Sequence, residues 1–227
     1  MPAVTVAGLD LAYAEHGEGP ATVLVHGMAS SAADWADAGA LPGRVIAYDR
    51  RGYGASTAPE PYTRTTVNEQ AEDLARLLTA LDAAPALLVG ADFGALVVLD
   101  VLLRHSGAAR AAVLIDPPLH QFTPEATEAL SAERLALEEA LREGGPEEAV
   151  ARWLGDCAGA ERVERARRDA RAFFADYGGL ATLPLARADL RGLAVPIGVV
   201  GRGEPVLRLV PHARAFADWR EAAGALA

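Results

Sequence analysis

Short apolar runs that alternate with longer helical patterns constrain the fold of this chain more than any other feature. The five runs lack the polar–apolar alternation of a half-exposed strand and cover 21–27, 44–49, 86–90, 111–116 and 195–201. Such continuous runs are typical of strands that are buried on both faces. Helical patterns lie between and beyond them, at 30–40, 66–82, 94–105 and from 124 to about 177. The sequence therefore predicts an α/β fold, a mostly parallel sheet that helices flank on both faces.

Two further segments complete the expected architecture. The N-terminal residues alternate around Gly8 and Leu9, which predicts an antiparallel hairpin. The segment 120–193 is rich in Ala, Arg and Glu, breaks at Gly144–Pro146 and Gly178–Gly179, and is too long for a simple crossover. We expect it to form a helical cap inserted into a core of residues 1–119 and 194–227.

The composition excludes several classes of partner. The net charge of −10 argues against nucleic acid and anionic lipid. No apolar run approaches the length of a membrane span, and the N-terminus lacks the layout of a signal peptide. Cys157 is the single cysteine, so no intramolecular disulfide is possible. A cytoplasmic location is expected.

One carboxylate, Asp92, stands where a strand should turn sharply into a helix. It lies at the centre of a Gly-X-Asp-X-Gly turn between the apolar run 86–90 and the helical pattern 94–105. Glycines suit such a turn because it leaves no room for Cβ atoms. At the start of a helix, backbone N–H groups and the helix dipole stabilise an anion. Asp92 is therefore a candidate nucleophile, and the alternative is that it only caps the helix.

Several motifs, in order, resemble the α/β-hydrolase fold. They are "VLVHGMASSAADW" (23–35), "DRRGYGAS" (49–56), "VGADFGA" (89–95), "VLIDPP" (113–118) and "VPIGVVGRGE" (195–204). The resemblance implies that Asp92 is the nucleophile and that the N–H groups of Met28 and Phe93 form an oxyanion hole. It places His26 in the oxyanion loop. It makes Asp49 and Arg50 parts of a structural turn.

Aspartate as the nucleophile resembles the epoxide hydrolase and haloalkane dehalogenase branches of that superfamily. A carboxylate is suited to displacement at a saturated carbon, which leaves an ester that water then cleaves. The dehalogenase branch is the weaker match, because Phe93 lacks the N–H that a tryptophan would offer to a halide. Tyr177 is the one tyrosine of the cap, whereas epoxide hydrolases usually have two. The resemblance implies a cofactor-free hydrolase, with no metal, that acts on an epoxide-like or halide molecule.

The base that would hydrolyse the ester is harder to place. The family normally has a histidine after its last strand, but a strand at 206–210 would follow 195–201 after too short a crossover. We therefore expect residues 210–226 to form a helix, so that the chain ends before the family's last strand. His212 would lie early in this helix and is the candidate base, with Asp116 as supporting acid and Glu204 as the alternative. If His212 does not reach Asp92, the chain is a fragment, is completed by a partner, or uses the fold without hydrolysis.

The remaining expectations concern the ligand and other functions. Trp35, Trp153 and Tyr177 are expected to line a cavity, and aromatic walls suit an apolar small molecule. An open sheet edge at 195–201 offers a surface for a homo-oligomer. A cyclase or isomerase of secondary metabolism and a non-catalytic small-molecule binder are the alternatives to hydrolysis.

Overall fold

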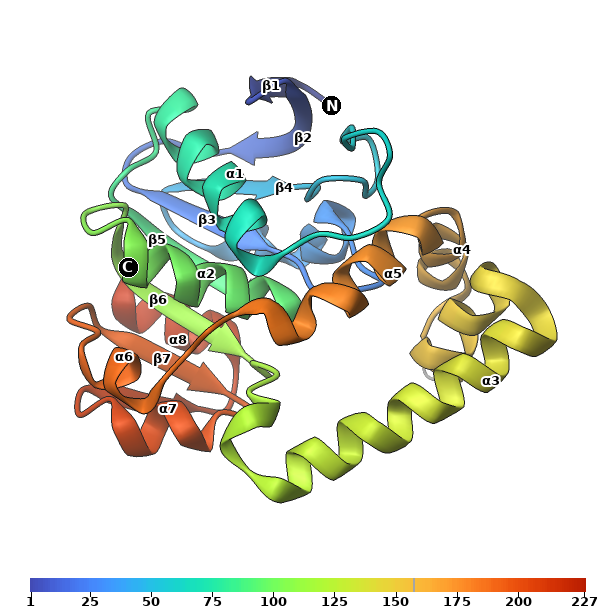
Figure 1. Ribbon diagram of the computed structural model, residues 1–227. Coiled ribbons are helices and arrows are strands. Elements are labelled where there is room, and N and C mark those ends of the chain that lie inside the picture. The colour runs from blue at the N-terminus through green and yellow to red at the C-terminus, as the bar shows by residue number, and fades with distance from the viewer. Residues whose placement is uncertain (157) are drawn as a thin grey trace.

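The computed structural model of the protein describes residues 1–156 and 158–227, so that Cys157 lies outside the described residues. Within them, strands form one eight-stranded sheet in the order β1-β2-β4-β3-β5-β6-β7-β8 (Figure 1). The strands are β1 (Ala3–Val6), β2 (Leu9–His16), β3 (Ala21–Val25), β4 (Arg44–Tyr48), β5 (Ala86–Ala91), β6 (Ala109–Ile115), β7 (Ile197–Val200) and β8 (Ala213–Phe216). β1 and β2 form the predicted antiparallel hairpin, and β3 to β8 are mutually parallel. The predicted fold class is confirmed.

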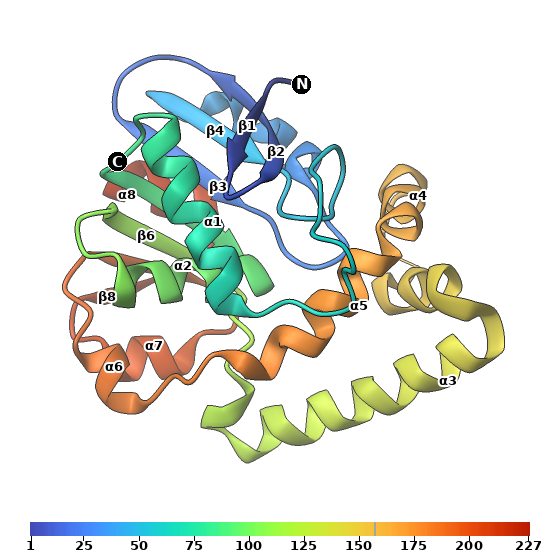
Figure 2. The same ribbon diagram turned by 45° about the horizontal axis from the view of Figure 1, so that its top comes forward.

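The parallel strands carry the apolar runs because helices cover both of their faces. All five residues of β3 are buried, and β5 is buried up to Gly90. On one face lie α1 (Val67–Ala80) and α2 (Phe93–Arg104), and α8 (Trp219–Leu226) packs on the other face with the short 3-10 helix Ala32–Ala40 (Figure 2). A capping box of Thr66 and Glu69 fixes the start of α1. The carboxyl ends of β3 and β5 are therefore held by a packed core.

The segment predicted as a cap is mostly helical in its described residues and lies between β6 and β7. It contains α3 (Pro124–Leu154), α4 (Ala160–Arg168), α5 (Ala170–Gly179) and α6 (Arg187–Arg191), with short 3-10 helices at His120–Phe122 and Leu180–Thr182. α3 bends at Gly145, whose φ is 78°, immediately before Pro146. α3 and α4 project beyond the sheet, whereas α5 lies along its edge (Figure 1). We keep the name cap for residues 120–193; its boundaries stay a prediction.

The C-terminal segment corrects the sequence interpretation. Residues 210–226 do not form one helix: β8 pairs with β7 in parallel, and only α8 is helical. The crossover between them is residues 201–212, which include α7 (Glu204–Leu209), and this is long enough to join parallel neighbours. The run 206–210 was rightly excluded as a strand, but the conclusion that the last strand is missing was wrong. The sheet edge expected at 195–201 is covered by β8, so the surface expected for a homo-oligomer lies one strand further out.

None of the helices in residues 1–156 and 158–227 combines the length and the apolar character needed to cross a membrane.

Candidate active site

The turn that carries Asp92 is held in a strained conformation. β5 ends at Ala91, Asp92 has φ 49° and ψ −121°, and α2 begins at Phe93. A Cβ at Gly90 would lie 2.5 Å from the carbonyl oxygen of Gly94, and one at Gly94 would collide with the carbonyls of Val25 and His26. Both glycines are required because helix and strands approach too closely for a side chain. The strain at Asp92 is sustained by the surrounding core.

The carboxylate of Asp92 is partly buried and bound at one oxygen. Its Oδ2 accepts a hydrogen bond from the backbone N–H of Met28 at 3.0 Å. Burial raises the pKa of Asp92 above its ordinary value, while the N–H groups of Met28 and Phe93 and the charge of Arg50 lower it. The effect of burial is the largest, so the net shift is upward. These are the two N–H groups that the sequence predicts as an oxyanion hole, and in this structure they face Asp92 itself.

His26 has no free nitrogen for proton transfer. Its Nδ1 lies 2.8 Å from the carbonyl oxygen of Gly27, which can only accept, and its Nε2 accepts from the backbone N–H of Arg50 at 2.9 Å. These bonds define the neutral tautomer with its proton on Nδ1. Complete burial and the nearby guanidinium of Arg50 hold the pKa of His26 well below its ordinary value. His26 therefore shapes the loop that precedes Met28.

A buried ion pair connects the segment after β4, which carries Arg50, to the cap. Nη2 of Arg50 donates to Oδ2 of Asp176, in α5, at 2.7 Å, and the two side chains are 1% and 0% exposed. Gln70 and Tyr53 complete the cluster with hydrogen bonds to Asp176 at 2.6 and 2.8 Å. Buried charges persist only when they are paired and hydrogen-bonded in this way. The sequence analysis assigned Arg50 to a structural turn and did not identify Asp176. The available signal was a single charged residue within the otherwise apolar and aromatic stretch 172–177.

The other half of the carboxyl edge, after β6 and β7, is more open. Asp116 follows β6 with a φ of 45° and its Oδ1 accepts from the backbone N–H of Arg202 at 2.9 Å. Asp116 and Arg202 line a cavity of about 550 Å³ together with His120 and Glu204. Burial lowers the pKa of His120. The two acids that the sequence proposed therefore share one cavity, and Asp116 is paired with an arginine.

His212 lies at the opposite edge of the sheet from Asp92. It directly precedes β8, and β8 runs parallel to β5, so His212 lies at the amino ends of the strands and Asp92 at their carboxyl ends. Its Nε2 donates to the carbonyl oxygen of Val195 at 2.6 Å. The expectation that His212 could reach Asp92 rested on a helix from 210 to 226 and does not hold. After β8 come Ala217 and Asp218, and Asp218 caps α8.

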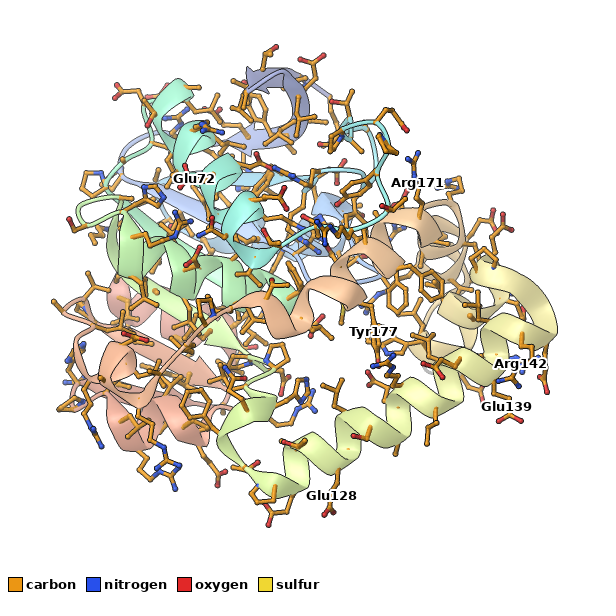
Figure 3. All side chains as sticks on the ribbon, viewed as in Figure 1. Glu72, Glu128, Glu139, Arg142, Arg171 and Tyr177 are labelled. Carbon is orange, nitrogen blue, oxygen red and sulfur yellow. The ribbon has the colours of Figure 1, made fainter. Side chains whose placement is uncertain are left out.

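The three aromatic residues expected to share a cavity are separated. Trp35 packs edge-on against Trp219 of α8, on the face of the sheet away from α1 and α2. Trp153 packs edge-on against Phe173 and lines a cavity beside the bend of α3. Tyr177 lines another cavity, of about 500 Å³, between α3 and α5 (Figure 3). Among the described residues that line these cavities, Asp92 does not occur, so the structure does not gather the three aromatics around it.

Burial also acts on the hydroxyl of Tyr177. No hydrogen bond of good geometry is formed by its buried oxygen within the described residues, and Glu133 and Glu138 of α3 lie nearby. Burial and these carboxylates raise the pKa of Tyr177, so the hydroxyl stays protonated. The predicted substrate contact of this residue stays a prediction.

Comparison with known proteins identifies the family of this chain. Residues 22–225 match the sequence model of the alpha/beta hydrolase family. The chain is similar to epoxide hydrolase A of Mycobacterium tuberculosis, with 35% identity over 120 residues that are 49% of this chain and 36% of the relative. It is also similar to bifunctional epoxide hydrolase 2 of Sus scrofa, with 31% identity over 124 residues, 52% of this chain and 22% of the relative. The aligned part thus spans well under half the length of these relatives.

Solved structures show the same fold over nearly the whole chain. A haloalkane dehalogenase from Agrobacterium tumefaciens superposes with a TM-score of 0.72 at 22% identity, and the match covers 94% of this chain and 86% of the dehalogenase. Its identity is low, so this likeness concerns the fold. With the elbow geometry, the strand order and the match over residues 22–225 together, the chain belongs to the alpha/beta hydrolase family.

Proposed function

We propose that this protein is an epoxide-hydrolase-like enzyme in which Asp92 is the nucleophile. The observation that carries the proposal is the hydrogen bond from the Met28 N–H to Oδ2 of Asp92. It holds one carboxylate oxygen and leaves Oδ1 as the atom that can attack. The similarity to proteins named epoxide hydrolases supports an epoxide as the substrate class.

The proposed first step is a displacement at a saturated carbon. Oδ1 of Asp92 forms a bond to an epoxide carbon, the carbon–oxygen bond of the ring breaks, and the released alkoxide takes a proton from water. The product is an ester of Asp92 whose carbonyl oxygen is Oδ2, still bound by Met28. The N–H groups of Met28 and Phe93 would then stabilise the negative charge that develops on Oδ2 when water attacks the ester.

The second step needs a base, and neither His26 nor His212 can supply it. Both nitrogens of His26 are bonded, and His212 lies at the far edge of the sheet. The carboxyl edge instead carries Asp116 after β6 and Asp218 after β8. A carboxylate bonded to N–H groups is a weak base, so we expect the ester to form faster than it is hydrolysed.

Trapping of the ester tests the proposal. The full chain is incubated with styrene oxide and its peptides are analysed by mass spectrometry. We expect an adduct with the mass of the epoxide on the peptide that contains Asp92, and none in Asp92→Asn. Slow hydrolysis in ¹⁸O-water should leave the label in the Asp92 carboxylate. An unmodified Asp92 across a panel of terminal and internal epoxides would contradict the proposal.

One observation favours a second function, a cyclase or isomerase that uses Asp92 as a general acid. Burial raises the pKa of Asp92, which favours the protonated carboxyl that a general acid requires. The two functions differ in their pH dependence. Adduct formation by a nucleophile rises with pH through the pKa of Asp92, whereas turnover by a general acid falls. A rate of reaction that falls with rising pH would select the second function.

A further inference from the structure

The peptide between Gly27 and Met28 is held at both ends by the groups described above. Its N–H donates to Oδ2 of Asp92 at 3.0 Å, and its carbonyl oxygen accepts from Nη2 of Arg50 at 2.9 Å and from Nδ1 of His26 at 2.8 Å. A trans peptide is planar, with its C=O and N–H pointing in opposite directions. Whatever fixes the carbonyl therefore aims the N–H at Asp92.

Arg50 is built to fix that carbonyl. Besides Gly27, its guanidinium binds the carbonyl of His26 at 2.8 Å through Nε and the side chain of Gln70 at 2.6 Å through Nη1. It also lies over the ring of Phe93, 5.0 Å from its centroid. One buried cation thus contacts the carbonyl of the peptide that carries the Met28 N–H, and the ring of Phe93, whose own N–H also faces Asp92. A cation at the carbonyl oxygen also polarises the peptide and strengthens its N–H as a donor.

Asp176 ties this arginine to the cap. It lies in α5 and is fully buried, and its carboxylate binds Arg50, Gln70 and Tyr53. Gln70 belongs to α1 and binds both Arg50 and Asp176. The cluster therefore joins the segment after β4, helix α1 and the cap. The position of Arg50 therefore depends on the docking of α5.

We propose that Arg50, held by Asp176 of the cap, is a positioning residue that aims and polarises the Gly27–Met28 peptide at Asp92. The proposal rests on the proposed function, since it concerns how the same carboxylate is prepared for attack. It differs from a purely structural ion pair in what it predicts for Asp92. A purely structural pair would leave the rate of adduct formation unchanged once both of its charges were removed.

The charges near Asp92 determine the direction in which each variant should shift its pKa. Arg50 is positive and lowers the pKa of Asp92, whereas Asp176 is negative and raises it. His26 is neutral, and burial beside Asp176 raises the pKa of Tyr53, so neither contributes a charge near neutral pH. Arg50→Met should therefore raise the pKa of Asp92 and Asp176→Asn should lower it. The two single variants break the same ion pair, yet we expect them to shift the pKa of Asp92 in opposite directions.

A neighbouring ion pair supplies the matched control. Arg51 binds Asp73 of α1 at 2.6 Å, with side chains 9% and 3% exposed, and neither residue has a hydrogen bond to the Gly27–Met28 peptide within the described part of the chain. Arg51→Met and Asp73→Asn should reduce stability without moving the pKa of Asp92. They should change the rate of adduct formation by less than about twofold, as expected for sites that share no contact with the peptide facing Asp92.

The pKa of Asp92 is measured on the full chain with ¹³C-labelled aspartate by NMR, assigned with Asp92→Asn. This readout needs no epoxide, so it separates failure of this inference from failure of the proposed function. We expect opposite shifts for Arg50→Met and Asp176→Asn and none for the two controls. Shifts in the same direction, or shifts equal to those of the controls, would overturn the proposal.

The double variant Arg50→Met/Asp176→Asn separates position from charge and avoids stranding one buried charge if a single variant fails to fold. Its pKa at Asp92 should return towards that of the parent because both charges are gone. Its rate of adduct formation with styrene oxide should stay at least about tenfold below that of the parent, the loss typical of a misaligned donor. A double variant that forms the adduct at the parental rate would show that Arg50 does not position the peptide.

Discussion

The two halves of the sheet's carboxyl edge are built differently. After β3 to β5, Met28, Arg50 and Asp92 form a closed network in which the Arg50–Asp176 ion pair is buried and Asp92 is partly buried. After β6 and β7, the ion pair of Asp116 and Arg202 is exposed, with side chains 44% and 84% accessible to solvent. Water screens the second pair and not the first.

Under the proposed function, the first half holds the nucleophile and the second half would complete the reaction. The first half fixes Asp92 in one orientation, which favours attack on a substrate. In the second half, Asp116 pairs with an exposed arginine, and Asp218 after β8 is occupied in capping α8. Under the proposed function, this chain is better prepared for forming an ester than for hydrolysing it. The following predictions test this contrast.

The largest expected effect comes from the close approach of α2 to the strands. Gly94→Ala would place a Cβ against the carbonyls of Val25 and His26, next to the loop that carries Met28. We expect a loss of about 3 kcal/mol in the free energy of unfolding, the upper range for overpacking of a core. The measurement is urea-induced unfolding followed by circular dichroism.

Gly178→Ala is the matched control in the cap. A Cβ at Gly178 meets nothing within 4 Å, and this glycine lies in α5. Alanine there should leave the stability unchanged or raise it by up to about 1 kcal/mol, because it favours the helix. Equal losses for the two variants would show that the elbow is no more tightly packed than the cap.

A smaller effect is expected from the charge of Asp92. Its pKa is raised by burial, so its protonated form contributes stability that is present below the ordinary value of 3.8 and is lost as the pH rises through the raised pKa. Asp92→Asn keeps the shape and tolerates the positive φ, but it does not titrate. The variant should therefore gain stability relative to the parent above that pH window, by about 1 kcal/mol, and not below it. Unfolding curves at a series of pH values measure the difference, and a gain that is independent of pH would exclude burial of the charge as its cause.

The smallest effect is expected at the amino end of β8. His212→Gln keeps a side-chain donor for the carbonyl of Val195 and lies away from Asp92. We expect a change in stability within about 0.5 kcal/mol, and unchanged rates of ester formation and hydrolysis. Both rates follow from mass spectrometry of the styrene oxide adduct over time. A tenfold slower hydrolysis of the ester in His212→Gln would show that His212 acts in the reaction and would contradict its position away from Asp92.

Local patterns in the sequence predicted the sheet, its helices and the turn at Asp92. Buried parallel strands must be apolar on both faces, and a turn as tight as the one between β5 and α2 must carry glycine at Gly90 and Gly94. The C-terminus was misjudged because β8 is only four residues long and includes Arg214, so its sequence also suits a helix. Pairing with β7 decides this segment, and pairing is a non-local interaction.

The sequence by itself determined the fold class and the carboxylate at the elbow, because hydrophobic periodicity and the steric demands of glycine act over neighbouring residues. Only the tertiary structure decided that Arg50 meets Asp176 from the cap, that His26 has both nitrogens bonded, and that His212 lies at the far edge of the sheet. These facts depend on contacts between segments far apart in the chain. A buried charge is stable only beside its partner, and that partner is fixed by the packing of the whole fold.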